Sequence, residues 1–191
     1  MENIKYTIVG IAPIPVQKLL QGVRGKFSLT LGKTSEPNNY VLKDTAHFAI
    51  KRSFYIKKGF SEIDIINKIK EISFKKIDII CSTAGIFTNS KYGNILFAKI
   101  DDYNDLLGLH DKVTIFLDKL TETINPEMER EKYIPHISLA YNLSSDNFNP
   151  IKKYIDDSIL PIKFNLDKIV LLKDFDLEKD ERKTVYEHFL A

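Results

Sequence analysis

The chain has a single cysteine in its 191 residues, Cys81, which excludes an internal disulfide framework and a cysteine-rich metal site. Cys81 follows the apolar residues Ile79 and Ile80, so we expect it to be a small buried hydrophobic residue. No apolar run approaches the roughly 18 residues of a membrane span, and the start of the chain lacks the long apolar stretch of a signal peptide. We therefore expect a reducing, cytoplasmic setting and no membrane role.

Low-complexity segments, short-period repeats and long linkers are also lacking. A hydrophobic content of 43% and a charged content of 28% are typical of an ordinary globular protein. The length suffices for one sizeable core. We expect residues 1–191 to form one domain of two lobes, with no obligate protein partner evident.

The net charge of +2 is unevenly distributed. The first 60 residues contain ten Lys and Arg against three Asp and Glu, and the remainder contains 18 against 23. A basic N-terminal third favours a phosphate-bearing ligand. Alternatively, these basic residues form an ordinary solvent-exposed face of lysines that binds no ligand.

Hydrophobic periodicity predicts an α+β pattern of two similar halves. Ser61 and Asp64 have the spacing of a capping box and predict the start of a helix. Two histidines are assigned no catalytic part: His110 lies on an apolar helical stripe, and His188 is expected at the surface. The predicted strands cover 6–11, 46–56, 77–83, 94–100, 134–142, 162–172 and 184–190. Four helices are predicted: one begins at Pro15, one follows Ser61, one covers 105–124, and one begins at Asn149-Pro150. The segment 85–93 is predicted to be rich in turns.

Two strand-like stretches have the same form, one at His47 and the other at His136. In the first, alternation places Phe48, Ile50, Phe54 and Ile56 on one face and His47, Ala49, Lys51, Ser53 and Tyr55 on the other. In the second, Ile137 and Leu139 face away from His136 and Ser138. Each strand therefore presents a histidine, and the residue two positions later, to a common space.

Paired histidines suit the in-line cleavage of a phosphodiester. One histidine takes a proton from the nucleophile while the other protonates the leaving oxygen, because the imidazole pKa is about 6.5. A hydroxyl at Ser138 can donate to a nonbridging phosphate oxygen, and Lys51 can add a positive charge. No metal or other cofactor is expected, since the histidines lack carboxylate or thiolate companions at ligand spacing.

These stretches resemble the two-histidine (2H) phosphoesterase superfamily, whose signature is a pair of His-x-Ser/Thr-x motifs. The second motif is matched by residues 130–140, with Arg130 ahead of it and Pro135 directly before His136, and the first by residues 47–51. The spacing of Phe164, Leu166, Ile169 and Leu171 resembles the C-terminal end of the family. The resemblance implies a bilobed fold with a pseudo-two-fold axis, in which two antiparallel sheets flank a central cleft and helices lie outside.

The resemblance also implies an activity, because the bacterial and archaeal branch contains RNA 2′,3′-cyclic phosphodiesterases, historically called 2′-5′ RNA ligases. By this resemblance His47 and His136 are the acid–base pair, and Ser138 and Lys51 bind the phosphate. The expected substrate is an RNA end, or a small nucleotide, with a 2′,3′-cyclic phosphate or a 2′-5′ linkage.

Two positions depart from the family pattern. Ala49 stands where the family has Ser or Thr, and loss of one such donor typically costs about a hundredfold in rate. Lys51, Thr45, Ser53 or a water can substitute for that hydroxyl, or the protein binds a nucleotide or RNA with weak or no catalysis. Tyr141 stands where relatives often carry a basic residue, and alternation directs it toward the core.

Overall fold

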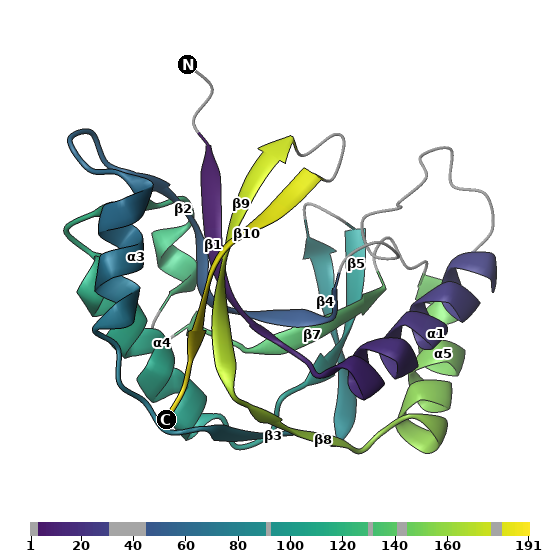
Figure 1. Ribbon diagram of the computed structural model, residues 1–191. Helices are drawn as coiled ribbons and strands as arrows, with labels where there is room; N and C mark the ends of the chain where they lie inside the picture. Colours follow the sequence, from purple (N-terminus) through teal and green to yellow (C-terminus); the bar gives the residue numbers. More distant parts are fainter. Residues whose placement is uncertain (1–3, 31–44, 91–92, 130–131, 141–144, 177–180) are drawn as a thin grey trace.

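The computed structural model describes residues 4–30, 45–90, 93–129, 132–140, 145–176 and 181–191 (Figure 1). Within these ranges the strands form a five-stranded, a three-stranded and a two-stranded sheet, and all their pairings are antiparallel. The expected α+β fold with two antiparallel sheets and outer helices is confirmed, and the two-stranded sheet is an addition to it.

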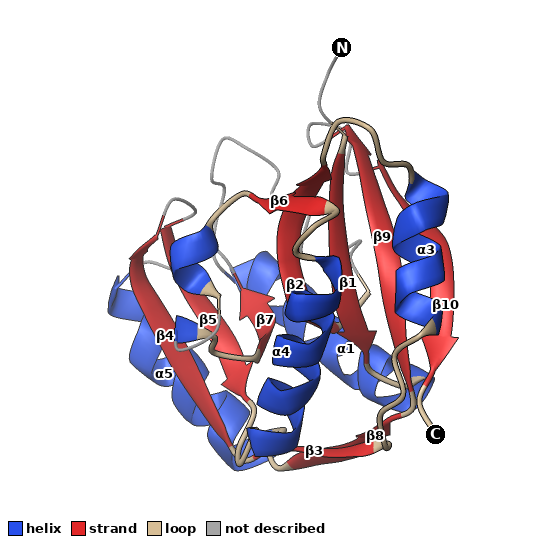
Figure 2. Cartoon of the chain, turned by 90° about the vertical axis from the view of Figure 1, so that its left-hand side faces the viewer, coloured by secondary structure: helices blue, strands red, loops and turns tan. Residues whose placement is uncertain are grey.

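The five-stranded sheet has the order β10-β9-β1-β2-β6. Two helices, α3 (Glu62–Lys70) and α4 (Asn104–Leu117), lie against one of its faces (Figure 2). The predicted capping box begins α3, since the Asp64 carboxylate accepts a hydrogen bond from the Ser61 backbone N–H at 2.8 Å. The strands are β1 (Lys5–Ile11), β2 (His47–Ile56), β6 (Thr121–Thr123), β9 (Lys168–Asp176) and β10 (Glu181–Phe189).

The three-stranded sheet has the order β4-β5-β7, with β4 (Thr83–Ser90), β5 (Gly93–Lys99) and β7 (His136–Ala140). Beside it lie α1 (Ile14–Thr30) and α5 (Ser145–Ser158), which touch where Lys26 Nζ lies 3.7 Å from the centre of the Tyr154 ring (Figure 1). The two-stranded sheet pairs β3 (Ile77–Cys81) with β8 (Ile162–Leu166), and Cys81 is buried as expected.

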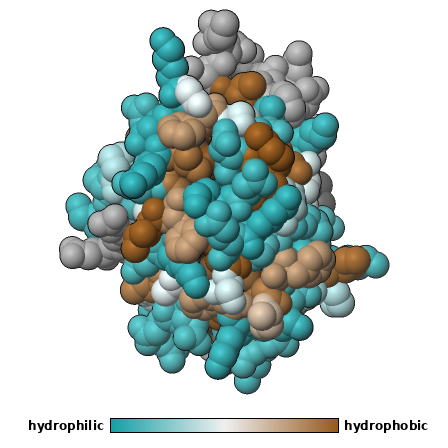
Figure 3. Space-filling view, turned by 60° about the vertical axis from the view of Figure 1, so that its left-hand side comes forward, coloured by the Kyte–Doolittle hydropathy of each residue, from teal (hydrophilic) through white to brown (hydrophobic). Residues whose placement is uncertain are grey.

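The surface view in Figure 3 shows hydrophobic residues interspersed with hydrophilic ones. No helix in the described ranges is long and apolar enough to cross a membrane.

The helix predicted over 105–124 is too long. Helix α4 ends at Leu117, and Thr121–Thr123 instead forms the edge strand β6, paired with the end of β2. The apolar stripe continues through Leu120 and Ile124, so periodicity alone did not reveal the end of the helix. Residues 121–123 form a strand because β2 has a free edge there. Pairing with that edge satisfies the backbone N–H and C=O groups of 121–123, which a longer helix would satisfy internally.

The turn-rich segment predicted at 85–93 is wrong, because β4 and β5 occupy most of it. Gly85 is not a turn residue: a Cβ atom there would lie 2.5 Å from the Phe97 ring, so glycine makes room for a cross-strand aromatic side chain. Helix α5 begins at Ser145, before the predicted Asn149-Pro150, and contains Pro150. The strand predicted over 162–172 is divided between β8 and β9.

Candidate active site

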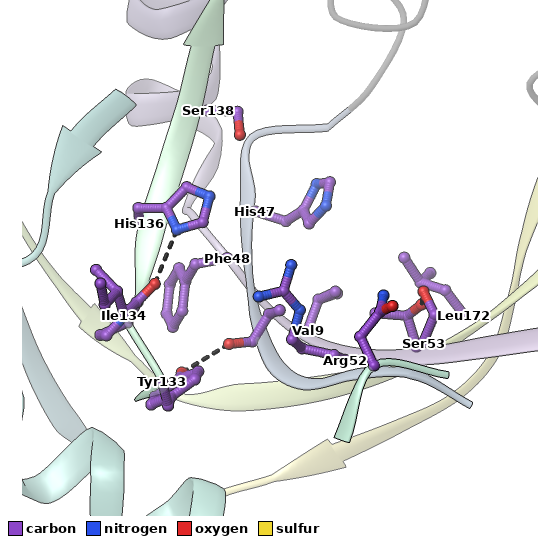
Figure 4. A pocket seen from close by; sticks show the side chains of 14 residues that line it. Val9, His47, Phe48, Arg52, Ser53, Tyr133, Ile134, His136, Ser138 and Leu172 are labelled. Atoms are coloured by element: carbon purple, nitrogen blue, oxygen red, sulfur yellow. Dashed lines mark hydrogen bonds between the residues drawn. The ribbon is translucent and has the colours of Figure 1, made fainter. Parts of the chain in front are cut away.

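A cleft of about 290 Å³ opens on the face of the five-stranded sheet opposite α3 and α4. Figure 4 shows the side chains that line it. The alternation of β1 defines the two faces: the Tyr6 hydroxyl donates to Glu62 of α3, whereas Thr7 lines the cleft. Strand β7 of the smaller sheet supplies the other wall. The predicted residues His47, His136 and Ser138 all line this cleft.

Each histidine of the cleft is oriented by a backbone carbonyl two residues earlier in the chain. His47 Nδ1 lies 2.6 Å from the Thr45 oxygen, and His136 Nδ1 lies 2.8 Å from the Ile134 oxygen. A carbonyl oxygen only accepts hydrogen bonds, so Nδ1 carries the proton in both rings. Nε2 is therefore the nitrogen of each ring that can exchange a proton with a ligand.

The pKa of His136 is lowered from its ordinary value, chiefly because burial disfavours the charged imidazolium. The positive charges of Arg52 and His47 lower it further, whereas the hydrogen bond to Ile134 opposes the shift. The shift favours the neutral imidazole, which has a lone pair on Nε2 when Nδ1 carries the proton.

Two aromatic rings support His136 from the side of its own sheet. Its ring centre lies 4.9 Å from that of Phe87 and 5.1 Å from that of Phe97. The two phenylalanines are themselves stacked at 4.2 Å, and Gly85 provides the space for Phe97. This packing restricts the orientation of the imidazole.

Lys51 does not lie where alternation predicts it. The residue is only 1% exposed, and Nζ donates a hydrogen bond to Thr123 Oγ1 of β6 at 2.9 Å. The expectation that Lys51 shares a face with His47 is therefore wrong, and the residue is not part of the cleft lining.

The physical reason is a pair of β-bulges in β2. Tyr6 of β1 pairs with Phe54. Three positions further along β1, Val9 pairs with Ala49, which lies five positions back along β2. The extra residues disturb the alternation of β2, so that Lys51 turns into the core and Arg52 turns into the cleft.

Three side chains bind the backbone of the bulged segment. His110 Nδ1 lies 2.6 Å from the Ile50 oxygen, and the Tyr133 hydroxyl donates to the oxygen of Ala49 at 2.6 Å. The Glu129 carboxylate accepts the backbone N–H of Arg52 at 3.1 Å. These bonds satisfy buried backbone groups and hold the bulge in one conformation.

The same side chains contact one another. The rings of His110 and Tyr133 stack at 4.0 Å with an interplanar angle of 5°, and His110 Nε2 lies 3.3 Å from Glu129 Oε2. His110 is fully buried, which confirms its interpretation as a residue bonded to a partner in the core. His188 lies outside the cleft lining, with Nε2 2.6 Å from the Ile72 oxygen.

Position 49 offers the cleft only a methyl group, because Ala49 lines it without a hydroxyl. Of the substitutes considered from the sequence, Ser53 lines the cleft, but its Oγ is hydrogen-bonded to Thr7 Oγ1 at 3.0 Å. Thr45 contributes its carbonyl to His47. Arg130 and Tyr141, which the sequence also singles out, lie outside the described residues.

Sequence reasoning missed Arg52, although a signal for it is present. Strict alternation would bury Arg52 among Phe48, Ile50 and Phe54, and an arginine is almost never fully buried without a partner. An arginine on the apolar face of a predicted strand is therefore evidence for a bulge.

The family model of the 2′-5′ RNA ligase superfamily matches residues 26–176, which is most of the sequence. The chain belongs to the 2′-5′ RNA ligase superfamily. The resemblance to 2H phosphoesterases is thereby confirmed, and the two histidine motifs of this superfamily member both fall in the matched region. No curated protein matches the chain in sequence.

Solved structures show the same fold at low sequence identity. E. coli LigT complexed with NADP+ is 13% identical with a TM-score of 0.68, over 100% of this chain and 99% of LigT. TT0787 of Thermus thermophilus is 12% identical with a TM-score of 0.64, over 97% of both chains. Usb1 of Kluyveromyces marxianus is 8% identical with a TM-score of 0.52, over 96% of this chain and 97% of Usb1.

Proposed function

We propose that this member of the 2′-5′ RNA ligase superfamily is a phosphodiesterase that needs no metal and cleaves 2′,3′-cyclic phosphates or 2′-5′ linkages. The observation that supports it best is that the two histidines have the same position in their strands and the same hydrogen bond to a backbone carbonyl. His47 and His136 come from different sheets, line one cleft, and each donates its Nδ1 proton to the carbonyl two residues earlier. Both present Nε2 for proton transfer.

In the proposed reaction on a cyclic phosphate, His136 is the general base and His47 the general acid. Neutral His136 takes a proton from a water molecule as the water oxygen bonds to phosphorus. The bond from phosphorus to one ribose oxygen breaks, and protonated His47 gives that oxygen its proton, which leaves a phosphate monoester. The lowered pKa of His136 supports its role as the base. Ser138 donates a hydrogen bond to a nonbridging oxygen.

Ligands of a relative support a nucleotide as substrate. LigT of E. coli has been crystallised with 3′-AMP, with ATP and with phosphate. An RNA end or a small cyclic or 2′-5′-linked nucleotide would place a phosphate between the two histidines of this chain.

A second candidate function is the binding of a nucleotide or RNA end with weak or no catalysis. Ala49 favours it, because the cleft lacks a hydroxyl donor at that position. Ala49→Ser separates the two functions: a binding protein gains turnover from the hydroxyl, whereas an active enzyme already turns over without it.

The test is incubation with an oligoribonucleotide ending in a 2′,3′-cyclic phosphate, in the presence of a chelator. We expect conversion to a terminal monophosphate, which a phosphatase then removes. His47→Ala and His136→Ala should each slow the reaction by about a hundredfold or more. His188→Ala is the matched control, since that histidine lies outside the cleft lining. Equal rates in all three variants would refute the assignment.

A further inference from the structure

Arg52 is the only Lys or Arg among the described residues that line the cleft. In Figure 4 its guanidinium group points toward the two histidines. Its charge acts on His136, whose pKa it lowers. A cation beside two proton-transferring groups creates a site for an anion.

This position is set by the fold and is not that of a freely moving surface side chain. The backbone N–H of Arg52 donates to Glu129, whose side chain is 5% exposed and whose carboxylate also accepts a hydrogen bond from Thr114. The carboxylate therefore binds the backbone of Arg52, while the guanidinium extends on into the cleft. A bonded bulge of this kind re-aims a side chain in a defined direction.

We propose that the guanidinium of Arg52 binds the substrate phosphate and takes the place of the hydroxyl that is missing at Ala49. The proposal rests on the proposed phosphodiesterase function, since it names the group that holds the phosphate in that reaction. Arg52 and Ala49 belong to the same strand and line the same cleft.

The chemistry of the two groups makes the exchange reasonable. A serine hydroxyl offers one donor to a phosphate oxygen, whereas a guanidinium offers several in a planar fork and carries a full charge. Such charge-assisted bonds are about twice as strong as neutral ones. Ser138 would bind the phosphate from β7, so the two sheets would hold it from opposite sides.

Binding of inorganic phosphate, measured by calorimetry, tests the proposal without turnover. Arg52→Gln should weaken binding by roughly 10- to 100-fold, the loss expected for hydrogen bonds to a charged group. Arg52→Lys keeps the charge without the fork and should lie between wild type and Arg52→Gln. Lys58→Gln removes one charge from an exposed position beyond the end of β2 and should leave binding within about twofold.

Turnover of the cyclic phosphate tests the relation to position 49. Ala49→Ser should raise the rate more in the Arg52→Gln background than in wild type, because the hydroxyl then replaces a lost donor. Equal phosphate affinity in wild type, Arg52→Gln and Arg52→Lys would overturn the proposal. If phosphate binding depends on Arg52 but no variant turns over, the site for the anion stands and the proposed hydrolysis fails.

Discussion

The substitution Gly85→Ala should displace the aromatic support of His136. The added Cβ would lie 2.5 and 2.6 Å from two atoms of the Phe97 ring, far inside ordinary van der Waals contact. Phe97 is only 6% exposed and packs against both Phe87 and His136, so its ring has little space to retreat. The strain therefore reaches the imidazole.

The size of the effect follows from the overlap. The ring must move by roughly 1 Å to restore contact distance, and overpacking of this kind costs about 1–3 kcal/mol. For a chain of this length that corresponds to a fall in Tm of roughly 2–12 °C. Turnover should fall as well, because an imidazole displaced by about 1 Å loses much of its alignment with the reacting atoms.

Thermal unfolding and turnover should be measured together on Gly85→Ala and on Gly25→Ala. Gly25 is the control, since a Cβ atom there meets nothing within 4 Å in helix α1, where alanine is the better helix former. Phe97→Leu should relieve the overlap, so the double variant with Gly85→Ala should be more stable than the sum of the single effects predicts. A Gly85→Ala protein as stable and active as wild type would refute the reasoning.

Four further predictions concern the bulge, the histidines and position 49. Tyr133→Phe should lower the free energy of unfolding by about 0.5–1.5 kcal/mol in urea denaturation, because the partly buried Ala49 carbonyl loses its hydroxyl donor; an unchanged midpoint would contradict this. The pKa of His136, measured by NMR, should lie below about 6.5, chiefly because burial disfavours the imidazolium, and it should rise in Arg52→Gln, because that variant removes a positive neighbour. The free energy of unfolding should fall as the pH decreases from about 6.5 through the lowered pKa of His136, since the unfolded chain binds a proton at this histidine more readily than the folded chain. A pKa above 6.5 would make the free energy of unfolding rise over that range instead. Ala49→Ser should leave stability nearly unchanged and raise turnover, and a decrease in rate would show that the added hydroxyl has no place at the phosphate.

Local patterns predicted the parts of the fold that depend on one segment at a time. Alternation in β7 placed Ile137 and Leu139 in the core and turned His136 and Ser138 the other way, as the structure has them. The capping box at Ser61 and the core position of His110 could likewise be predicted from neighbouring residues. Each of these features depends on residues within, or directly before, a single helix or strand.

Other elements depended on distant partners. Thr121–Thr123 becomes a strand because β2 leaves an edge to pair with, and Gly85 lies in β4 because Phe97 crosses over it. The partner of Thr121–Thr123 is far away in sequence, and Phe97 lies on the strand after Gly85, so local propensity indicated a helix in one case and a turn in the other. Tertiary pairing outweighs such propensities of a few tenths of a kcal/mol per residue.

The amino-acid sequence by itself determined the family, the two histidine motifs and the absence of a hydroxyl at Ala49. Only the tertiary structure decided which positively charged side chain lines the cleft. Lys51 and Arg52 are adjacent, and a shift of one residue in a strand exchanges the faces on which they lie. The bulges that produce this shift are held by Glu129 and Tyr133, more than 70 residues along the chain. A contact of that range is created by folding, and the sequence shows of it only an arginine on the apolar face of the predicted strand.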